Sequence, residues 1–354
     1  MQRQSAGARG TQTIFFDQRE KRQGDKKMTK FTKFKTLAAV SAAVLTLGHS
    51  APAFAQTAWD MATPYPDAEF HTRNIAQFAQ DIADATSGGL NITVHSGSSL
   101  FKHPEIKRAV QNQFVPIGEV LMANLFNDDP IFGADNIPFI ASTYEDAKTL
   151  WDAQRPLVEA KLAEDGIRLL YAVPWPGQGF YTNKELTSGS DLQGMRFRTY
   201  NSTTARMAEL LGAAPTTIEA VEIPQAFSTG IVDAMVTSGA TGVRTKAWDF
   251  TTQFYDLQAW LPKNMIIVNE AAFSALPEDQ QTAILEAAAA AETRGWKMSE
   301  EVSSASVTEL AANMTVHQPS EALSADLAAI GKTMATEWAA SVGDQGKMIL
   351  DALN

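Results

Sequence analysis

The sequence predicts an α/β protein built from two lobes. Runs typical of strands and helices alternate along the chain in two series, which are separated near residue 175. Repeated strand–helix–strand units favour largely parallel sheets with right-handed crossovers. A third observation is an Ala- and Glu-rich stretch, residues 277–314, which is long enough to form a helix lying across both lobes.

The first series occupies residues 57–175. Apolar residues between His71 and Gly89 fall on one helical stripe, and glycines end the run, so we predict an amphipathic helix here. Further helices are predicted over residues 103–113, where a proline stands near the first turn, and around residues 144–164. The strands of this series are predicted over residues 57–63, 90–96, 114–122 and 168–175.

The second series occupies residues 194–239. A helix is predicted over residues 202–212, which begin with Ser and Thr as capping residues and end at a glycine. A short helix is predicted over residues 223–230, with Pro224 near its start. The strands are predicted over residues 194–200, 214–218 and 231–239.

The stretch 277–314 has no proline after its first residue and contains a single glycine. It is predicted to form one long helix, or two helices in succession. The mature chain shows no internal repeat, low-complexity tract or flexible linker.

The N-terminus has the order of a secretory signal peptide. A basic segment begins at Met28, an apolar run of about a dozen residues follows, and small residues stand at Ala53 and Ala55. We expect cleavage after Ala55, a start at Met28, and export to the periplasm. The apolar run is too short for a membrane anchor, which needs about 20 residues. The alternative is a buried N-terminal helix, and in either case residues 1–55 are left out of the fold.

The remaining chain is strongly acidic. Residues 1–55 contain ten of the 29 Lys and Arg and three of the 40 Asp and Glu, so 19 basic and 37 acidic residues remain, a net charge of about −18. Such a charge argues against nucleic acid or anionic membrane as a partner. We expect a soluble exported monomer that is not inserted in a membrane.

Catalytic and metal-binding patterns are missing from the sequence. The chain has no cysteine, and its five histidines show no ligand spacing. There is no G-x-S-x-G elbow and no Gly-rich phosphate loop. We therefore predict a binding protein with no catalytic residue, metal or cofactor.

Candidate site residues follow from the rule that open parallel sheets bind ligands beyond the C-terminal ends of their strands. Both lobes offer polar and aromatic side chains there, as is usual in small-molecule clefts. The candidates are Tyr65, Glu119 and the segment Trp175–Gln178 in the first series, and Arg198, Thr237 and Ser238 in the second.

Arg198 is the strongest candidate because a guanidinium binds a carboxylate through two parallel hydrogen bonds. The alternative is an arginine that is exposed at a strand end or paired with Asp191 or Glu209. Glu119 could accept hydrogen bonds from a ligand, or it could be a solvated or internally paired carboxylate. Trp175 and Trp248 could be cleft walls or simply core residues.

Several blocks resemble the solute-binding proteins of TRAP transporters, the DctP family. "DLQGMRFRTYN" resembles the family's D-L-x-G-x-[KR]-x-R block. The similarity extends to "SGSSLFKHPEIKRAVQNQFVPIGEV", "DNIPF", "AELLGAAPTTI", "EIPQAFSTGIVDAM" and "FYDLQAWLPKN", and so covers nearly the whole mature chain.

The resemblance implies a two-lobed periplasmic binding protein, type II-like, with hinge strands and a long helix across both lobes. It implies lobe I over residues 56–177 with about 264–280, and lobe II over residues 178–263, with C-terminal helices of about 281–354 packing on lobe II and across both. It also implies delivery of an organic acid to small and large membrane permease subunits, in transport driven by an ion gradient.

The family's carboxylate-binding arginine matches Arg198, and its first-lobe acidic residue matches Glu119. Gln178 stands where some members have a second arginine, and Thr237 or Ser238 stands where an asparagine is frequent. One strong cation suits a monocarboxylate better than a dicarboxylate, although an aromatic, hydroxy or amine-bearing acid stays open. The alternatives are a receptor for another transporter type or a sensor, and a secreted α/β enzyme.

Overall fold

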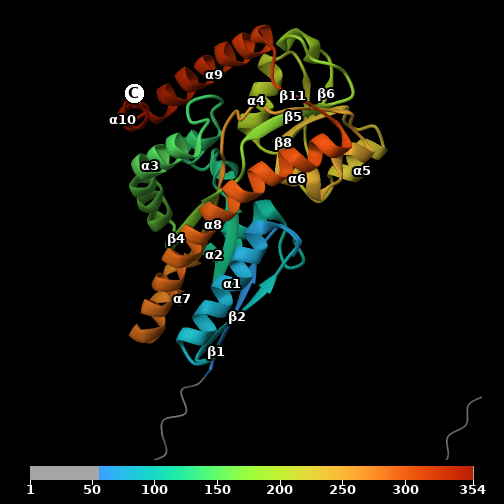
Figure 1. Ribbon diagram of the computed structural model, residues 1–354. Coiled ribbons are helices and arrows are strands. Elements are labelled where there is room, and N and C mark those ends of the chain that lie inside the picture. The colour runs from blue at the N-terminus through green and yellow to red at the C-terminus, as the bar shows by residue number, and fades with distance from the viewer. Residues whose placement is uncertain (1–55, 354) are drawn as a thin grey trace, which may run out of the picture. The chain divides into compact units, whose positions relative to one another are not determined.

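Two β-sheets organise residues 56–353, which are the residues that the computed structural model describes (Figure 1). The first sheet has the strand order β2-β1-β3-β10-β4, and the second has the order β11-β9-β5-β8-β6-β7. We call the first sheet with its helices lobe I and the second lobe II. The predicted signal peptide, its cleavage after Ala55 and the start at Met28 lie outside the described residues.

The strands of lobe I are β1 (Thr57–Ala62), β2 (Leu90–His95), β3 (Ile117–Leu121), β4 (Ile167–Pro174) and β10 (Lys263–Asn269). The strands of lobe II are β5 (Gln178–Thr182), β6 (Arg196–Thr199), β7 (Ala214–Thr217), β8 (Ala234–Ser238), β9 (Gln253–Tyr255) and β11 (Thr315–His317).

The α-helices include all those predicted. In the first half of the chain they are α1 (Phe70–Ala85), α2 (Ile106–Gln111) and α3 (Tyr144–Glu164). In the second half they are α4 (Ser202–Leu210), α5 (Ile223–Ser228), α6 (Gly239–Arg244), α7 (Glu270–Ser274), α8 (Glu278–Asn313), α9 (Glu321–Val342) and α10 (Asp344–Asp351). Five short 3₁₀ segments are also described: η1 (His103–Glu105), η2 (Met122–Leu125), η3 (Pro130–Asn136), η4 (Gly189–Leu192) and η5 (Ala247–Asp249).

Both sheets are largely parallel, as predicted, and each contains one strand that runs antiparallel to the others. Strands β1, β2 and β3 pair in parallel, as do β6, β7 and β8. Strand β10 runs antiparallel to β3 and β4, and β5 runs antiparallel to β8 and β9. The reason is topological: β5 directly follows β4 of lobe I, and β10 directly follows β9 of lobe II. Each of these two strands therefore enters its sheet from the end where the neighbouring strands finish.

Helix α8 confirms the prediction of one long helix across both lobes, and it crosses the molecule diagonally in Figure 1. It contacts α1 and β4 in lobe I, and α6 and β11 in lobe II. Gly295 allows its close approach, because a Cβ at this position would stand 2.4 Å from Val173 Cγ2 and 2.7 Å from Asn74 Nδ2.

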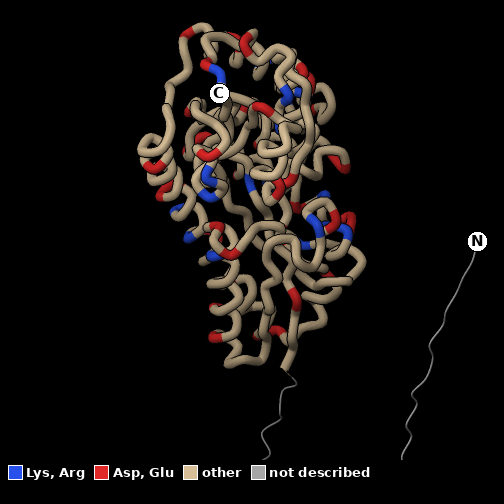
Figure 2. The backbone as a smooth tube through the Cα atoms, turned by 90° about the vertical axis from the view of Figure 1, so that its right-hand side faces the viewer, with Lys and Arg blue, Asp and Glu red and all other residues tan. Residues whose placement is uncertain are grey.

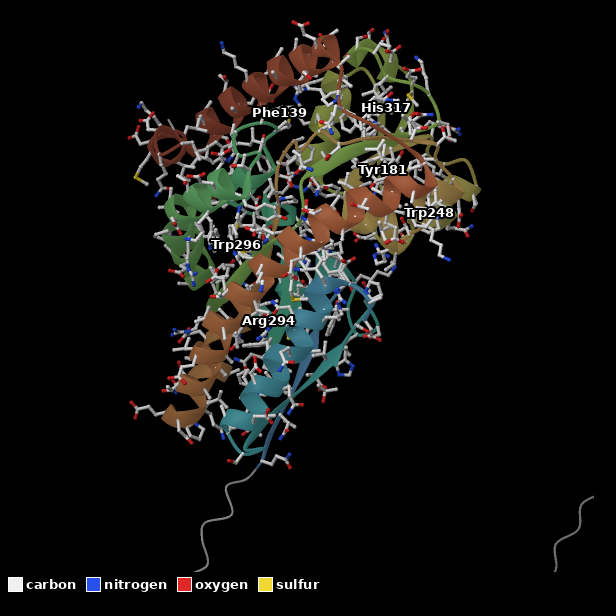
Figure 3. All side chains as sticks on the ribbon, in the orientation of Figure 1. Phe139, Tyr181, Trp248, Arg294, Trp296 and His317 are labelled. Atoms are coloured by element: carbon white, nitrogen blue, oxygen red, sulfur yellow. The ribbon has the colours of Figure 1, made fainter. Side chains whose placement is uncertain are left out.

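Two side chains of α8 form hydrogen bonds with the backbone of β4, the edge strand of the first sheet. Glu292 Oε1 accepts a hydrogen bond from the Ala172 N–H at 3.2 Å. Trp296 Nε1, labelled in Figure 3, donates to the Ala172 carbonyl at 3.0 Å. The helix thus satisfies a backbone edge that would otherwise be open for pairing with another strand.

Charged residues are spread over both lobes, and Lys and Arg are interspersed with Asp and Glu along the tube in Figure 2. This pattern agrees with an acidic chain that lacks a broad basic face in this view. Among residues 56–353, no helix is both long and apolar enough to cross a membrane.

Candidate functional site

Arg198 lies in β6, between β8 and β7, and its side chain is buried with only 2% exposed. Its Nε donates to the Ile218 carbonyl at 3.0 Å, and its Nη1 donates to the Val236 carbonyl at 3.1 Å. The Tyr200 ring lies 5.3 Å from the guanidinium carbon. Backbone carbonyls therefore fix the guanidinium plane.

No carboxylate among residues 56–353 forms an ion pair with Arg198. Asp191 pairs instead with Lys184, and Glu209 pairs with Arg206, so both alternatives from the sequence are wrong. Burial lowers the pKa of Arg198 to about 10, and the nearby Tyr200 and Glu219 oppose this shift. The side chain keeps its charge at neutral pH, which leaves a buried cation without a counter-ion.

Arg198 opens onto a cavity of about 50 Å³ between the lobes. A space of this size excludes a polymer. On the side of lobe I and its connecting segments it is lined by Tyr65, His103, Leu121, Asn124, Trp175 and Pro262. On the side of lobe II it is lined by Gln178, Arg198, Tyr200, Glu219, Ala220, Thr237, Ser238 and Thr241.

The predicted candidates from the strand ends thus meet in one place, with one exception. Tyr65, Trp175, Gln178, Thr237 and Ser238 all line the cavity together with Arg198. Glu119 does not line it.

Glu119 lies beneath the cavity wall, in the middle of β3. Its Oε1 accepts from Asn264 Nδ2 at 2.6 Å, and its Oε2 accepts from the Thr63 hydroxyl. Burial raises the pKa of Glu119 to about 7, although both hydrogen bonds oppose the shift. The carboxyl is internally paired, which is the alternative that its sequence position left open.

Asn264 connects this carboxyl to the aromatic wall. Its Oδ1 accepts from Trp175 Nε1 at 2.9 Å and from the Tyr65 hydroxyl at 3.4 Å. The two rings meet edge to face with centroids 5.0 Å apart. One amide therefore orients both aromatic side chains that face the ligand space.

The opposite wall is formed where β8 ends and α6 begins. Ser238 caps α6, since its Oγ accepts from the Thr241 N–H at 3.2 Å. Gln178 begins β5, and its Nε2 donates to the Pro176 carbonyl at 2.9 Å. These contacts leave the wall polar but without a second cation.

Trp248 lies away from the cavity. It is half-buried in η5 and packs in the hydrophobic cluster of lobe II, where Figure 3 labels it. Of the two tryptophans that could have formed cleft walls, only Trp175 lines the cavity.

Sequence reasoning missed several lining residues, chiefly His103, Asn124, Tyr200 and Glu219. Tyr200 and Glu219 follow the ends of β6 and β7, so the strand-end rule could have found them. His103 begins a 3₁₀ segment after a loop, and no periodicity marks that position.

Residues 56–353 contain no group of three His, Asp or Glu side chains that could hold a metal ion. The arrangement is one of binding: a fixed cation, aromatic walls and polar strand ends surround one cavity between the lobes.

A family model described as bacterial extracellular solute-binding protein, family 7 (DctP) matches residues 61–342. The solved structures of DctP6 and DctP7, Bordetella pertussis extracytoplasmic solute receptors binding pyroglutamic acid, are 42% and 45% identical to this chain. Each aligns with a TM-score of 0.83 over 84% of this chain and 99% of its own.

A marine metagenome TRAP solute-binding protein, specific for pyroglutamate and in complex with co-purified pyroglutamate, is 41% identical. It has a TM-score of 0.83 over 84% of this chain and 98% of its own.

Proposed function

The chain belongs to family 7 of the bacterial extracellular solute-binding proteins, the DctP family, and we propose that its ligand is a small cyclic monocarboxylate of the pyroglutamate kind. Arg198 is the residue that binds the carboxylate. The observation that carries this proposal is a buried guanidinium that faces the cavity between the lobes and forms no ion pair with a carboxylate of the described residues.

The Arg198 N–H groups that have no protein partner support a carboxylate as the ligand group bound in the cavity. Nε and Nη1 already donate to backbone carbonyls, and Nη2 donates no hydrogen bond to any of the described residues. An anion at this position removes the cost of an unpaired buried charge, which is several kcal/mol for an isolated ion. A neutral ligand would leave that cost in place.

The composition of the walls supports one carboxylate rather than two. Arg198 is the only Lys or Arg among the cavity-lining residues of the described chain, and Gln178 stands where some family members have a second arginine. Tyr65 and Trp175 offer flat apolar faces to a small ring. The three similar structures that bind pyroglutamate, at 41–45% identity, support a ligand of this class.

Ligand capture would close the cleft. Tyr65 comes from lobe I and Arg198 from lobe II, so a ligand that contacts both stabilises the closed arrangement by its differential affinity. The closed form is then the one that the TRAP permease subunits recognise, a step inferred from the family. Glu119 acts indirectly, through Asn264, as a positioning residue.

We also propose export with a signal peptide that is cleaved after Ala55, as the N-terminal sequence predicts. Intact mass measurement of protein recovered from the periplasm tests this, and a mature chain beginning at Gln56 is the expected result. Retention of residues before Gln56 would contradict it.

The proposed ligand is tested by titrating the purified protein with L-pyroglutamate in a calorimeter, with glutarate and a small amine as comparison ligands. We expect saturable one-site binding of pyroglutamate, weaker binding of the dicarboxylate and none of the amine. Tighter binding of glutarate than of pyroglutamate would contradict the proposed ligand class.

A further inference from the structure

Glu219 is the one acidic residue that lines the cavity within the described chain. It follows β7 in lobe II, and about a third of its side chain is exposed. Neither of its carboxylate oxygens has a hydrogen-bond donor within 3.5 Å among residues 56–353. The cavity thus contains a guanidinium and a carboxylate that do not pair with each other.

His103 approaches Glu219 from lobe I. Its Nδ1 lies 3.7 Å from Glu219 Oε2, which is longer than a hydrogen bond. Its Nε2 accepts from the Leu121 N–H at 3.0 Å, so the hydrogen of a neutral ring sits on Nδ1. The backbone therefore fixes the ring as a donor that faces the carboxylate, and acceptor capacity on Glu219 is still unused.

The surroundings favour an ionised Glu219. Burial alone would raise its pKa, but His103, Arg198 and Lys102 hold the pKa of Glu219 below its ordinary value. An ionised carboxylate only accepts hydrogen bonds. It attracts a ligand N–H and repels a ring oxygen or a second carboxylate.

We propose that Glu219 is a specificity-determining residue that accepts a hydrogen bond from an N–H of the bound acid. The inference rests on the proposed function and deepens it. A lactam acid satisfies both groups, because its carboxylate binds Arg198 and its ring N–H reaches Glu219. An acid with an acceptor in place of the N–H leaves Glu219 unpaired, and sites built around a hydrogen bond reject such analogues strongly.

The test compares L-pyroglutamate with its lactone analogue, 5-oxotetrahydrofuran-2-carboxylate, in which a ring oxygen replaces the N–H. We expect the wild type to bind the lactam at least 10-fold more tightly. Glu219→Gln should reduce this ratio to below about 3-fold, because an amide can donate to the ring oxygen as well as accept from an N–H.

Glu222→Gln is the matched control, since Glu222 is exposed on the same segment outside the cavity. It removes the same charge and should keep the wild-type ratio. Thermal unfolding of each variant checks that the fold is intact. Large losses of stability are unexpected, because Glu222 is exposed and the Glu219 carboxylate accepts no hydrogen bond from the described residues.

The outcomes separate the two proposals. An unchanged lactam preference in folded Glu219→Gln overturns the role of Glu219 and leaves the proposed ligand standing. A wild type that binds neither compound overturns the proposed ligand, and this inference with it. A fall in the ratio in Glu222→Gln as large as in Glu219→Gln would reduce the effect to general charge and would also overturn the role of Glu219.

Discussion

At the scale of single residues, the site is characterised by two buried ionisable side chains, Arg198 and Glu119. Arg198 and Glu119 are both almost fully buried, yet their surroundings differ. Glu119 has two hydrogen-bond donors and no need of a ligand, whereas Arg198 has two carbonyl partners and no anion. The first is therefore satisfied within the fold, whereas the second supports the proposed role in binding an anion.

Glu119 should make stability depend on pH. Burial raises the pKa of this carboxyl from its ordinary value of 4.5 to about 7. The folded chain then keeps a proton that the unfolded chain releases, so this contribution to stability is complete below about pH 4.5 and is lost as the pH rises through about 7. Between pH 5 and pH 8 the loss amounts to about 2.5 kcal/mol.

Urea unfolding of the wild type and Glu119→Gln at both pH values measures the effect. The neutral, equally sized variant should lose less stability on going to pH 8 than the wild type loses. Equal losses of stability in the two proteins would show that the pH dependence does not come from a proton held by the Glu119 carboxyl in the folded chain.

Trp175 should contribute to affinity through its hydrogen bond. Trp175→Phe keeps an aromatic ring beside Tyr65 but removes the donor that orients Asn264. We expect about 3- to 10-fold weaker ligand binding by calorimetry, which corresponds to the loss of one neutral hydrogen bond. Trp248→Phe, in the lobe II cluster, is the control, and an equal loss there would contradict the assignment.

Strand position identified most of the candidates that line the cavity, and there is a clear cause for the one candidate that does not line it, Glu119. Arg198, Thr237 and Ser238 stand near strand ends and reach the cavity. Glu119 was assigned to a strand end, but β3 continues to Leu121, and it is Leu121 that reaches the cavity. The end of a buried strand is hard to place from sequence, because an apolar run continues into the next 3₁₀ turn.

At the scale of elements, α8 is the segment whose packing is most constrained. Its single glycine, Gly295, lies against Val173 of β4 and Asn74 of α1. Arg294, beside it and labelled in Figure 3, donates to Asn74 Oδ1 at 2.7 Å and pairs with Asp81 at 3.1 Å. The helix is thereby fixed to lobe I at this point.

Gly295→Ala should destabilise the protein although alanine favours helices. Propensity alone would stabilise a helix by about 1 kcal/mol, but the new methyl group overlaps Val173, and overpacking typically costs about 1–3 kcal/mol. We expect a net loss in chemical unfolding. Ala290→Gly, at an exposed position of α8, measures how much the change between glycine and alanine alters the free energy of unfolding through helix propensity alone. A gain of stability in Gly295→Ala would contradict the close packing around Gly295.

The helices were easier to predict from sequence than the strands that join the lobes. Periodicity, caps and glycine stops identified α1, α4 and α8. Strands β5, β9 and β11 were not identified as elements, because two of them have three residues and the third follows β4 after only a few residues. The direction of β10 and β5 depends on tertiary crossings, which local patterns do not contain.

At the scale of the whole molecule, an ion pair connects the two lobes beside the cavity. Arg244 of α6 in lobe II donates to Glu69 Oε2 at 2.8 Å, and Glu69 caps α1 in lobe I. Burial raises the pKa of Glu69, while Arg244 opposes that shift. The pair exists only when the lobes are together, so it favours the closed form.

Arg244→Ala should therefore weaken ligand binding without touching the ligand. It leaves Glu69 buried without its partner, and a smaller population of the closed form lowers the apparent affinity in proportion. We expect about a 10-fold loss by calorimetry and a larger radius of gyration of the free protein in X-ray scattering. Arg168→Ala removes a pair within lobe I, to Glu270, and should change neither value; an equal change there would argue against a role in closure.

The comparisons confirm the family and the two-lobed fold that the sequence blocks predicted. What the sequence could not provide is the approach of His103 to Glu219, because these residues lie on different lobes and come together only when the two lobes meet.

The most direct test of the account is a calorimetric titration of Arg198→Ala and Arg196→Ala with L-pyroglutamate. Both arginines lie in β6, but Arg196 is exposed and paired with Asp233 outside the cavity. Arg198→Ala should fold and show no measurable binding, while Arg196→Ala should bind like the wild type. Binding of wild-type affinity by folded Arg198→Ala would contradict the claim that this arginine anchors the ligand.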